Sequence, residues 1–289
     1  MSATNSHEPA NTAVDAPEPD SDASHSVPVE ALEPSVLEHT QTVAKAEPAR
    51  RSELQEAMRS GYVEPFPGAT FDWFLDYAQP QTMMFYMDLV PYLNHLLAKL
   101  QYGLTLSVLD AGCGSGAGAE LLGSLHRSTF LGHRYDMTGI DLYDTYKRYA
   151  DQAYLNMKYQ IGDIHEMEAQ SFDVVICSHV IEHFNDPTAF MKQLQNISRY
   201  FALFYCPLNE VKLLDEGRGH LRSIDPAFVE GFDPAFVEVR QSLAWRHPDD
   251  ARSDCVVFAL PGARWAELQR QRRIDWSGTR ALSVRVGES

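Results

Sequence analysis

The sequence predicts an α/β fold: a doubly wound, mostly parallel seven-stranded sheet with helices on both faces and a terminal antiparallel hairpin. Short apolar runs alternate with helical segments from about residue 104 onward. The run 172–177, FDVVIC, is almost continuously apolar, as expected of a strand buried on both faces. The last two apolar runs are joined only by a polar, proline-containing link, which indicates an antiparallel pair.

Each element follows from its local pattern. The expected strands are 105–109, 136–140, 157–160, 172–177, 200–205, 237–245 and 255–260. The expected helices are 117–125, 144–153 and 187–198. Asp186 followed by Pro187 is the order favoured at the start of a helix, so it fixes the beginning of the last one.

Composition divides the chain into three expected parts. Residues 1–50 hold six prolines and nine acidic residues but no aromatic residue, which predicts a disordered acidic tail. Residues 51–103 form an expected N-terminal helical cap, and residues 104–289 form the sheet domain. The cap is dense in methionine and aromatic residues, a pattern more typical of core than of a binding site. Some of these side chains are nevertheless candidates to line a pocket: Trp73, Phe74, Tyr77, Tyr86 and Tyr92.

Charge and cysteine content limit the class of protein. The formal net charge of −16 argues against nucleic acid or an anionic membrane as the main partner. The four cysteines include no CxxC pair, which favours reduced thiols over a disulfide framework or a zinc knuckle. Neither a secretory leader nor a membrane-spanning run is recognised, so we expect a soluble, cytoplasmic protein. The oligomeric state and the role of the tail stay open.

A glycine-rich segment, DAGCGSGAG, follows the first expected strand and opens a helix. Gly112, Gly114 and Gly116 permit a tight turn whose backbone amides can approach a ligand. Gly112, Gly114 and Ala117 also satisfy the dinucleotide fingerprint, in which a helix N-terminus holds a pyrophosphate. The glycines alone therefore fit two kinds of nucleoside ligand.

Acidic residues on either side of the loop favour one of these ligands. Asp110 would repel a pyrophosphate, but it suits a ligand that carries an ammonium and a sulfonium. Asp141 ends the second expected strand, where a carboxylate can accept hydrogen bonds from both hydroxyls of a ribose. Asp163 follows the third strand, within reach of an adenine amino group. The segment 178–183 follows the fourth, at the carboxyl edge where ligands of open α/β sheets bind.

The ordered run of DAGCGSG, GIDLYD, GDI, FDVVICSHVIEHFNDP and a closing hairpin resembles the class I S-adenosylmethionine-dependent methyltransferases over about residues 104–260. The resemblance implies the strand order 3-2-1-4-5-7-6 with strand seven antiparallel, and S-adenosylmethionine as cofactor. It implies a cofactor-binding set: Gly112, Gly114 and Gly116 at the methionine end, Asp110 orienting the loop, Asp141 with Leu142 at the ribose, Asp163 and Ile164 flanking adenine, and Ser178 near the donor. One departure is the absence of a glycine turn before the fifth strand, which leaves that boundary poorly defined.

A competing motif lies within the fourth element. Residues 179–183, HVIEH, match the HxxEH pattern of inverted zinc proteases. That chemistry needs a helix presenting both histidines and a third ligand further on, whereas here the motif follows a buried strand. We therefore assign no metal at this stage, and zinc content would decide the matter.

The acceptor side is less specific. His179, His183 and His220 are candidate general bases for a hydroxyl acceptor, although each could equally be a structural histidine. The segment GHLRSIDPAFV resembles the HVRxFTPEEL segment of small-molecule and glycan-associated methyltransferases, which favours His220 and makes Arg222 a candidate ligand of an acidic group.

No NPPY or DPPY signature follows strand four, so O-methylation of a small molecule or sugar is the first hypothesis. Two alternatives remain: a nicotinamide-dependent oxidoreductase on a related sheet, and a non-catalytic adenosylmethionine-binding partner protein.

Overall fold

The computed structural model describes residues 56, 58–60, 62, 64, 68–98, 100, 103–125, 133–209, 219–242 and 254–266. The chain divides into two compact units, Met1–Glu53 and Leu54–Ser289, and all described residues belong to the second. The predicted acidic tail, the end of the strand expected at 237–245 and most of the link that follows it lie outside the described residues. The three-part domain division stays a prediction.

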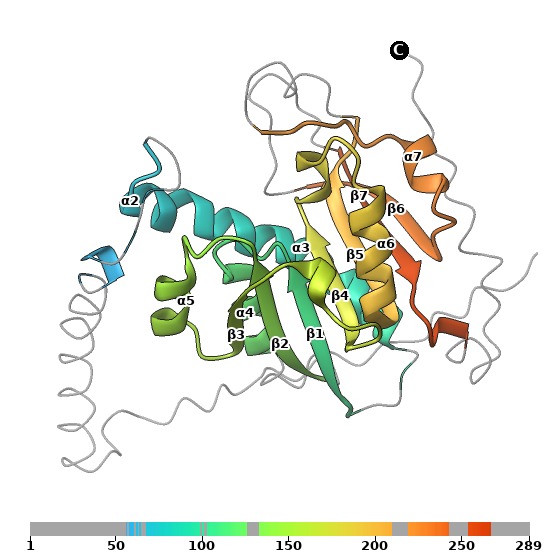
Figure 1. Ribbon diagram of the computed structural model, residues 1–289, viewed down its shortest axis with the longest axis horizontal. Coiled ribbons are helices and arrows are strands. Elements are labelled where there is room, and N and C mark those ends of the chain that lie inside the picture. Colours follow the sequence, from blue (N-terminus) through green and yellow to red (C-terminus); the bar gives the residue numbers. More distant parts are fainter. Residues whose placement is uncertain are drawn as a thin grey trace, which may run out of the picture. The chain divides into compact units, whose positions relative to one another are not determined.

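One seven-stranded sheet forms the centre of the second unit, in the order β3-β2-β1-β4-β5-β7-β6 (Figure 1). Only β7 runs antiparallel to its neighbours, β5 and β6. The predicted fold class and strand order are therefore confirmed. The strands are β1 (Thr105–Ala111), β2 (Arg134–Asp141), β3 (Met157–Ile161), β4 (Phe172–Ser178), β5 (Ser198–Pro207), β6 (Phe236–Gln241) and β7 (Asp254–Pro261).

Helices pack on both faces of this sheet. They are α2 (Phe71–Trp73), the π-helical turn η2 (Phe74–Ala78), α3 (Gln79–Leu97), α4 (Ala117–Leu125), α5 (Lys147–Ala153), the 3₁₀ turns η3 (Ile164–Glu166) and η4 (Ile181–His183), α6 (Thr188–Ile197) and α7 (Pro226–Glu230). Alternate residues of β1 enter opposite cores: Val108 packs in the core with α3 and α4, and Leu109 packs in the core with α6. A central strand buried on both faces explains its nearly continuous apolar sequence.

The junction between α6 and β5 differs from the sequence-based boundary. We expected the strand at 200–205, but it begins directly at Ser198, where ψ turns to 135°. The Ser198 hydroxyl donates to the Gln195 carbonyl at 2.8 Å, which satisfies one of the last carbonyls of the helix. Ser198 is in the extended region, so the chain enters β5 without a left-handed residue. A glycine is therefore not needed at this junction.

The aromatic stripe of the N-terminal segment is mostly core. Phe74 is fully buried, stacks on Tyr146 and contacts Tyr149 edge-on. Tyr92 is also buried, and its hydroxyl donates to Glu238 at 2.7 Å. Of the aromatic residues proposed as pocket lining, these two therefore have packing roles.

A buried polar network attaches α3 to the far end of the sheet. Asp88, only 4% exposed, pairs with Arg240 at 2.7 Å. It also accepts hydrogen bonds from the hydroxyls of Tyr205 at 2.8 Å and Ser242 at 3.1 Å. A buried carboxylate with three partners is well compensated for its loss of water.

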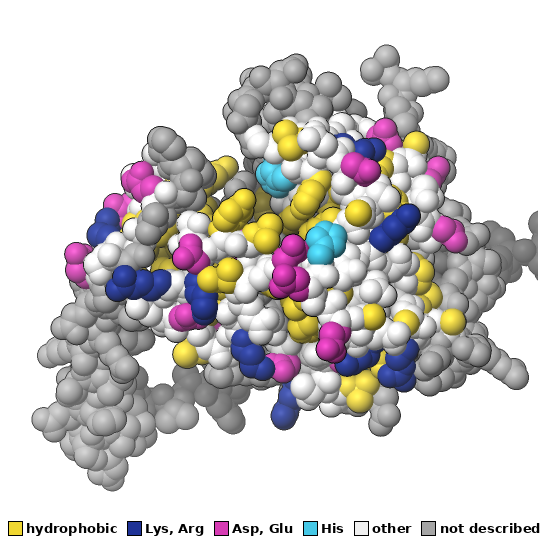
Figure 2. Space-filling view, in the orientation of Figure 1, with side chains coloured by type: hydrophobic (Ala, Val, Ile, Leu, Met, Phe, Trp, Pro, Cys, Tyr) yellow, Lys and Arg dark blue, Asp and Glu magenta, His cyan; other side chains and the backbone are white. Residues whose placement is uncertain are grey.

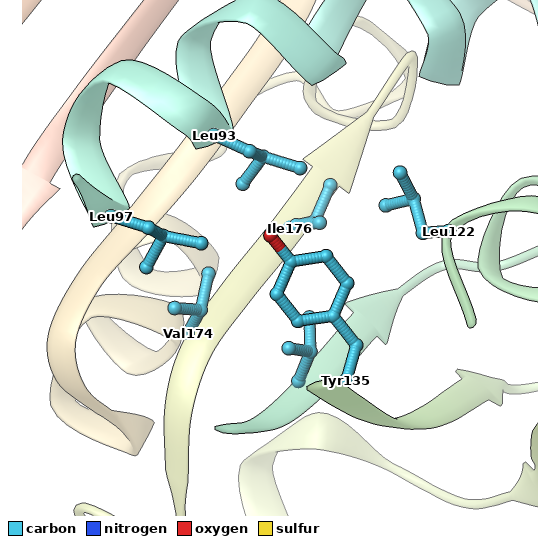
Figure 3. A pocket seen from close by; sticks show the side chains of 7 residues that line it. Leu93, Leu97, Leu122, Tyr135, Val174 and Ile176 are labelled. Atoms are coloured by element: carbon cyan, nitrogen blue, oxygen red, sulfur yellow. The ribbon is translucent and has the colours of Figure 1, made fainter. Parts of the chain in front are cut away.

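An apolar gap remains where α3 and α4 meet the sheet (Figure 3). Its lining is Leu93, Leu97, Val108, Leu122, Tyr135, Val174 and Ile176. Within the described part of the chain, the Tyr135 hydroxyl has no hydrogen-bond partner, and burial raises the pKa of this phenol. The gap belongs to the core and not to a ligand site.

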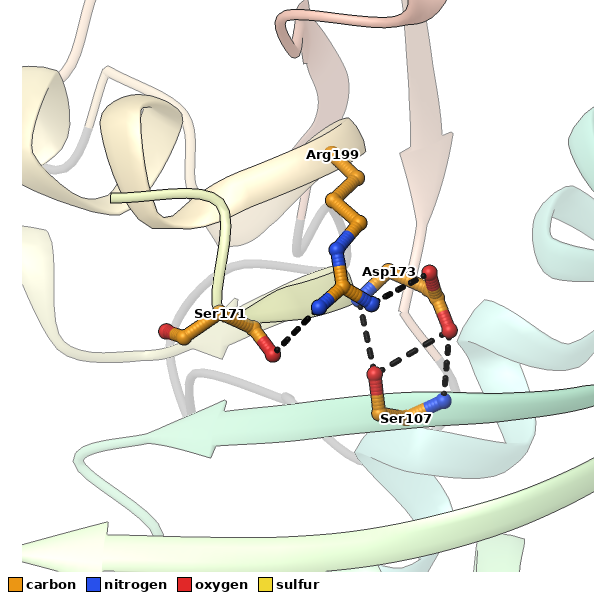
Figure 4. Close-up of polar contacts among 4 residues, drawn as sticks. All are labelled: Ser107, Ser171, Asp173 and Arg199. Carbon is orange, nitrogen blue, oxygen red and sulfur yellow. Dashed lines mark hydrogen bonds and ion pairs between the residues drawn. The ribbon is translucent and has the colours of Figure 1, made fainter. Parts of the chain in front are cut away.

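A second polar cluster ties the beginnings of three strands together (Figure 4). Asp173 accepts hydrogen bonds from the backbone N–H of Ser107 at 2.9 Å and from its hydroxyl at 3.0 Å. Its other oxygen pairs with Arg199 at 3.0 Å, and Arg199 also donates to the Ser171 carbonyl. Because this cluster lies at the amino ends of β1, β4 and β5, it is remote from the carboxyl edge where ligands bind.

No helix in the described ranges is long and apolar enough to cross a membrane.

Candidate active site

The glycine loop between β1 and α4 has the backbone geometry that its sequence requires. Gly112 and Gly114 adopt φ angles of +72° and +52°. A Cβ on Gly112 would lie 2.7 Å from a methyl group of Val180, so only glycine fits beside that side chain. A Cβ on Gly114 would meet nothing within 4 Å, which leaves this part of the loop open. The loop is held to β2 because Gly112 and Cys113 both donate backbone N–H groups to the Ile140 carbonyl.

Asp110 lies behind the loop and is only 1% exposed. One carboxylate oxygen accepts a hydrogen bond from the Tyr86 hydroxyl of α3, and the other has no partner among the described residues. Burial, together with the nearby charge of Asp141, raises the pKa of Asp110 to about 7, although the Tyr86 hydrogen bond opposes this shift. The site therefore holds a carboxyl group that a cationic ligand would ionise.

Asp141, at the end of β2, lies across from the loop. Its two oxygens accept backbone N–H groups from Gly114 at 2.9 Å and Tyr143 at 3.1 Å. The Tyr159 hydroxyl of β3 donates to the Gly114 carbonyl at 2.7 Å. The next residue, Leu142, is 60% exposed. Asp141 thus fixes the loop and still presents lone pairs to a ligand.

The end of β3 comes close to the same point. Gly162 donates its N–H to the Asp141 carbonyl at 3.0 Å. Asp163 begins η3 by accepting the N–H of His165 at 2.9 Å, and Ile164 is buried. Asp163 and Ile164, the two residues predicted to flank adenine, therefore follow the end of β3, which pairs with the end of β2 that carries Asp141.

His179 follows β4 with a left-handed φ of +55°. Its ring stacks on Phe85 with centroids 3.7 Å apart, and its Nδ1 lies 3.2 Å from the Ser178 hydroxyl. Burial lowers the pKa of His179 to about 3. A ring with that pKa is a weak base near neutral pH, so these contacts favour the other two histidines as bases.

Three other side chains meet just beyond β4. Glu182, His183 and His220 offer ligand atoms that all lie within 4.8 Å of one another. Glu182 is 1% exposed, and the two imidazole rings meet edge-on with centroids 4.7 Å apart. Arg222 follows on the same segment, where its guanidinium donates to the Asn185 carbonyl at 3.2 Å. The guanidinium also lies 4.3 Å from the centre of the Phe228 ring.

Residues 109–204, from the end of β1 into β5, match the methyltransferase domain family. This stretch, about a third of the chain, is thereby similar to the class I S-adenosylmethionine-dependent methyltransferases. The cofactor of this class is S-adenosylmethionine, as the two acidic residues beside the loop predicted. The match therefore favours this cofactor over the dinucleotide that the glycines alone also allowed.

Curated relatives share part of this domain. Ubiquinone biosynthesis O-methyltransferases from strains of Coxiella burnetii are 37% identical over 91 residues, which covers 29% of this chain and 36% of theirs. The chain thus matches about a third of the length of these relatives.

Solved structures with a similar fold include two methyltransferases. Magnesium protoporphyrin IX methyltransferase from Synechocystis PCC 6803, solved with bound SAH, is 17% identical with a TM-score of 0.44, covering 64% of this chain and 84% of that one. The DszA carbon methyltransferase is 16% identical with a TM-score of 0.48, covering 68% and 59%.

The fold brings most of the predicted site residues to one edge of the sheet. The glycine loop, Asp141 and Ser178 lie at the carboxyl ends of β1, β2 and β4. Figure 2 shows hydrophobic side chains gathered in a band across the middle of one face, with histidine and acidic side chains beside it. The HxxEH pattern does not form the helix that zinc proteases need, because residues 181–183 make a single 3₁₀ turn.

Sequence reasoning missed three contributors. Tyr86 was considered only as pocket lining, yet it bonds directly to Asp110. Tyr159 and Glu182 were not selected at all. Only Glu182 could have been recognised from the sequence, because it lies inside the HxxEH pattern. The two tyrosines lie in an apolar helix and a strand, where an aromatic residue is typical of core packing.

Proposed function

We propose that this protein is an S-adenosylmethionine-dependent methyltransferase that methylates a hydroxyl oxygen of a small acceptor. The observation that carries the proposal is the pair of carboxylates around the glycine loop. Asp110 is buried with one oxygen unpartnered among the described residues, and Asp141 binds the amide of Gly114. This arrangement suits a cationic nucleoside and disfavours a pyrophosphate.

The residues present fit the cofactor. The open side of Gly114 leaves room for a ligand against the loop, and the lone pairs of Asp141 can accept ribose hydroxyls. The unpartnered oxygen of Asp110 is a buried polar atom that an ammonium group would satisfy. Asp163 and Ile164, at the end of β3, are proposed to flank the adenine, and Ser178 to lie near the methyl donor.

When bound, S-adenosylmethionine supplies a methyl group on a sulfonium, which is already a good leaving group. The protein's task is therefore to align the acceptor oxygen with that group and to exclude water, an effect that can supply roughly 7–11 kcal/mol. A general base adds about 10²- to 10⁴-fold by taking the hydroxyl proton. His183 and His220, at the edge beyond β4, are the proposed bases, and Arg222 the proposed ligand of an acidic group on the acceptor.

Oxygen as the methyl acceptor is supported by two observations. The curated relatives are O-methyltransferases by name, and the chain has no NPPY or DPPY signature after β4. The cytoplasm stays the proposed location, supported by four buried cysteines and by the lack of a CxxC pair in the sequence.

Binding of the cofactor tests the donor site. Asp141→Ala should weaken S-adenosylmethionine binding at least about tenfold, because the loop amide of Gly114 and the ribose both lose their acceptor. Asp144→Ala, an exposed carboxylate three residues along, is the matched control and should bind normally. Calorimetric titration with S-adenosylmethionine and with NAD decides the question. NAD binding without S-adenosylmethionine binding would overturn the proposal.

A further inference from the structure

We propose that Glu182, His183 and His220 form a binding site for one divalent transition-metal cation of the zinc type. These residues are up to 38 positions apart in the chain, yet their ligand atoms come together within 4.8 Å. This set differs from the HxxEH pattern, which would use His179 as a ligand. The ring of His179 is instead stacked on Phe85.

The backbone holds this cluster in place. The Glu182 carbonyl accepts the N–H groups of Leu221 at 2.7 Å and Arg222 at 3.1 Å. These two bonds fasten the segment that carries His220 against η4. The site is thus formed by two crossing backbone segments, and its geometry does not depend on the long side chains alone.

The orientation of His183 is typical of a metal ligand. Its Nδ1 lies 2.9 Å from the Gly219 carbonyl oxygen. A carbonyl can only accept, so in the neutral ring Nδ1 carries the hydrogen and the lone pair lies on Nε2. Metal-binding histidines usually make this bond, because it fixes both the tautomer and the ring direction.

The donor set indicates the class of metal. Two imidazoles and one carboxylate are the ligands of catalytic zinc sites and of several other transition-metal sites, whereas magnesium and calcium prefer oxygen ligands. Glu182 is 1% exposed and His220 is 9% exposed, whereas His183 is exposed, so the site is open to solvent on the His183 side. Three protein ligands leave coordination positions open.

The location suggests what the open positions bind. A methyl group of Val180, two residues before Glu182, lies 2.7 Å from where a Cβ of Gly112 would be, so the cluster adjoins the glycine loop. With a cation bound, His183 and His220 would be ligands and not bases, and an acceptor hydroxyl in an open position would instead have a lower pKa. Its proton then leaves to solvent, the oxygen forms the bond to the methyl carbon, and the carbon–sulfur bond breaks with its electrons on sulfur. This catalytic role rests on the proposed function; the binding of the metal does not.

Metal titration of the full chain tests the site. After treatment with chelator, Zn²⁺ is titrated calorimetrically and Co²⁺ by visible absorption, with Mg²⁺ as a comparison. We expect one Zn²⁺ or Co²⁺ per chain, with binding at least about 100-fold weaker in His220→Ala and Glu182→Gln. His165→Ala, which removes an exposed histidine on η3, is the matched control and should bind as the wild type does.

Each variant is also titrated with S-adenosylmethionine. This titration shows, independently of metal binding, whether the variant is folded and its donor site intact. Loss of metal with normal cofactor binding supports the metal site. The metal site is overturned if the wild type binds no transition metal, or if His220→Ala and Glu182→Gln bind the metal as tightly as the wild type does. Either result leaves the donor site standing. Normal metal binding without cofactor binding supports the metal site and overturns the proposed function instead.

Discussion

Asp110→Asn should abolish a pH dependence of cofactor binding that the wild-type protein shows. Burial raises the pKa of the Asp110 carboxyl to about 7, so in the free protein it ionises near neutrality. A cationic ligand binds the ionised form better. Asparagine keeps the shape and can still accept the Tyr86 hydrogen bond, but it never acquires a charge.

The size of the effect follows from the fraction ionised. With a pKa of about 7, roughly a tenth of the Asp110 carboxyls are ionised at about pH 6 and roughly three quarters at about pH 7.5. If only the ionised form accepts the ligand, affinity should rise about eightfold over this interval. An α-amino group of pKa about 7.7–8.0 is still roughly 60–75% protonated at about pH 7.5, so partial loss of the ammonium charge reduces the expected rise to about five- to sixfold.

Calorimetric titration at several pH values is the assay. The wild type should gain affinity with pH and release a proton on binding, whereas Asp110→Asn should bind weakly and equally at each pH. Asp144→Asn, with its exposed side chain, should keep the wild-type slope. A flat wild-type profile, or the same slope in Asp110→Asn, would refute the reasoning.

The same carboxyl makes a linked prediction for stability. Between the usual value of 3.8 and the folded value of about 7, the folded protein binds more protons than the unfolded chain, so Asp110 lowers stability as pH rises. The free energy of unfolding of Asp110→Asn, relative to wild type, should therefore increase by roughly 2–3 kcal/mol between about pH 5 and pH 7.5. Urea denaturation of both proteins without cofactor measures this difference.

Three further predictions concern hydroxyls and carboxylates. Tyr86→Phe removes the hydrogen bond that lowers the pKa of Asp110, so the pH profile of cofactor binding should move to higher pH in the same titration. Tyr135→Phe should leave the free energy of unfolding unchanged or raise it, because its hydroxyl has no partner among the described residues, whereas Tyr205→Phe should lower it by about 1–3 kcal/mol. Thermal denaturation compares the pair, and the reverse order would contradict the assignment. Asp173→Ala should cost about 1–3 kcal/mol of stability without changing cofactor affinity, since it lies at the opposite edge of the sheet.

Local sequence pattern accounts for most of the fold. The helix expected at 117–125 has the same bounds in the structure, because a strand, a glycine turn and an amphipathic run mark its start. The entry to β5 could not be predicted, since a serine that bonds back to the helix does the work of the missing glycine. No local pattern distinguishes that serine from any other.

The site was only partly readable for a related reason. The loop glycines, Asp110 and Asp141 stand in a recognisable order along the chain. The bond from Tyr86 to Asp110 joins residues 24 positions apart on a helix and a strand, and its partner choice depends on how α3 packs. The meeting of Glu182 with His220 likewise depends on two backbone bonds from residues 221 and 222, which no spacing in the sequence encodes.

Methyl transfer itself is the most direct test of the proposed function. The protein is incubated with methyl-labelled S-adenosylmethionine and a panel of hydroxylated aromatic compounds and sugars, and products are identified by mass spectrometry. We predict a labelled methyl ether and an equal amount of S-adenosylhomocysteine, both lost in Asp141→Ala and retained in Asp144→Ala. Label transferred only to nitrogen or carbon, or no transfer although the cofactor binds, would contradict the account.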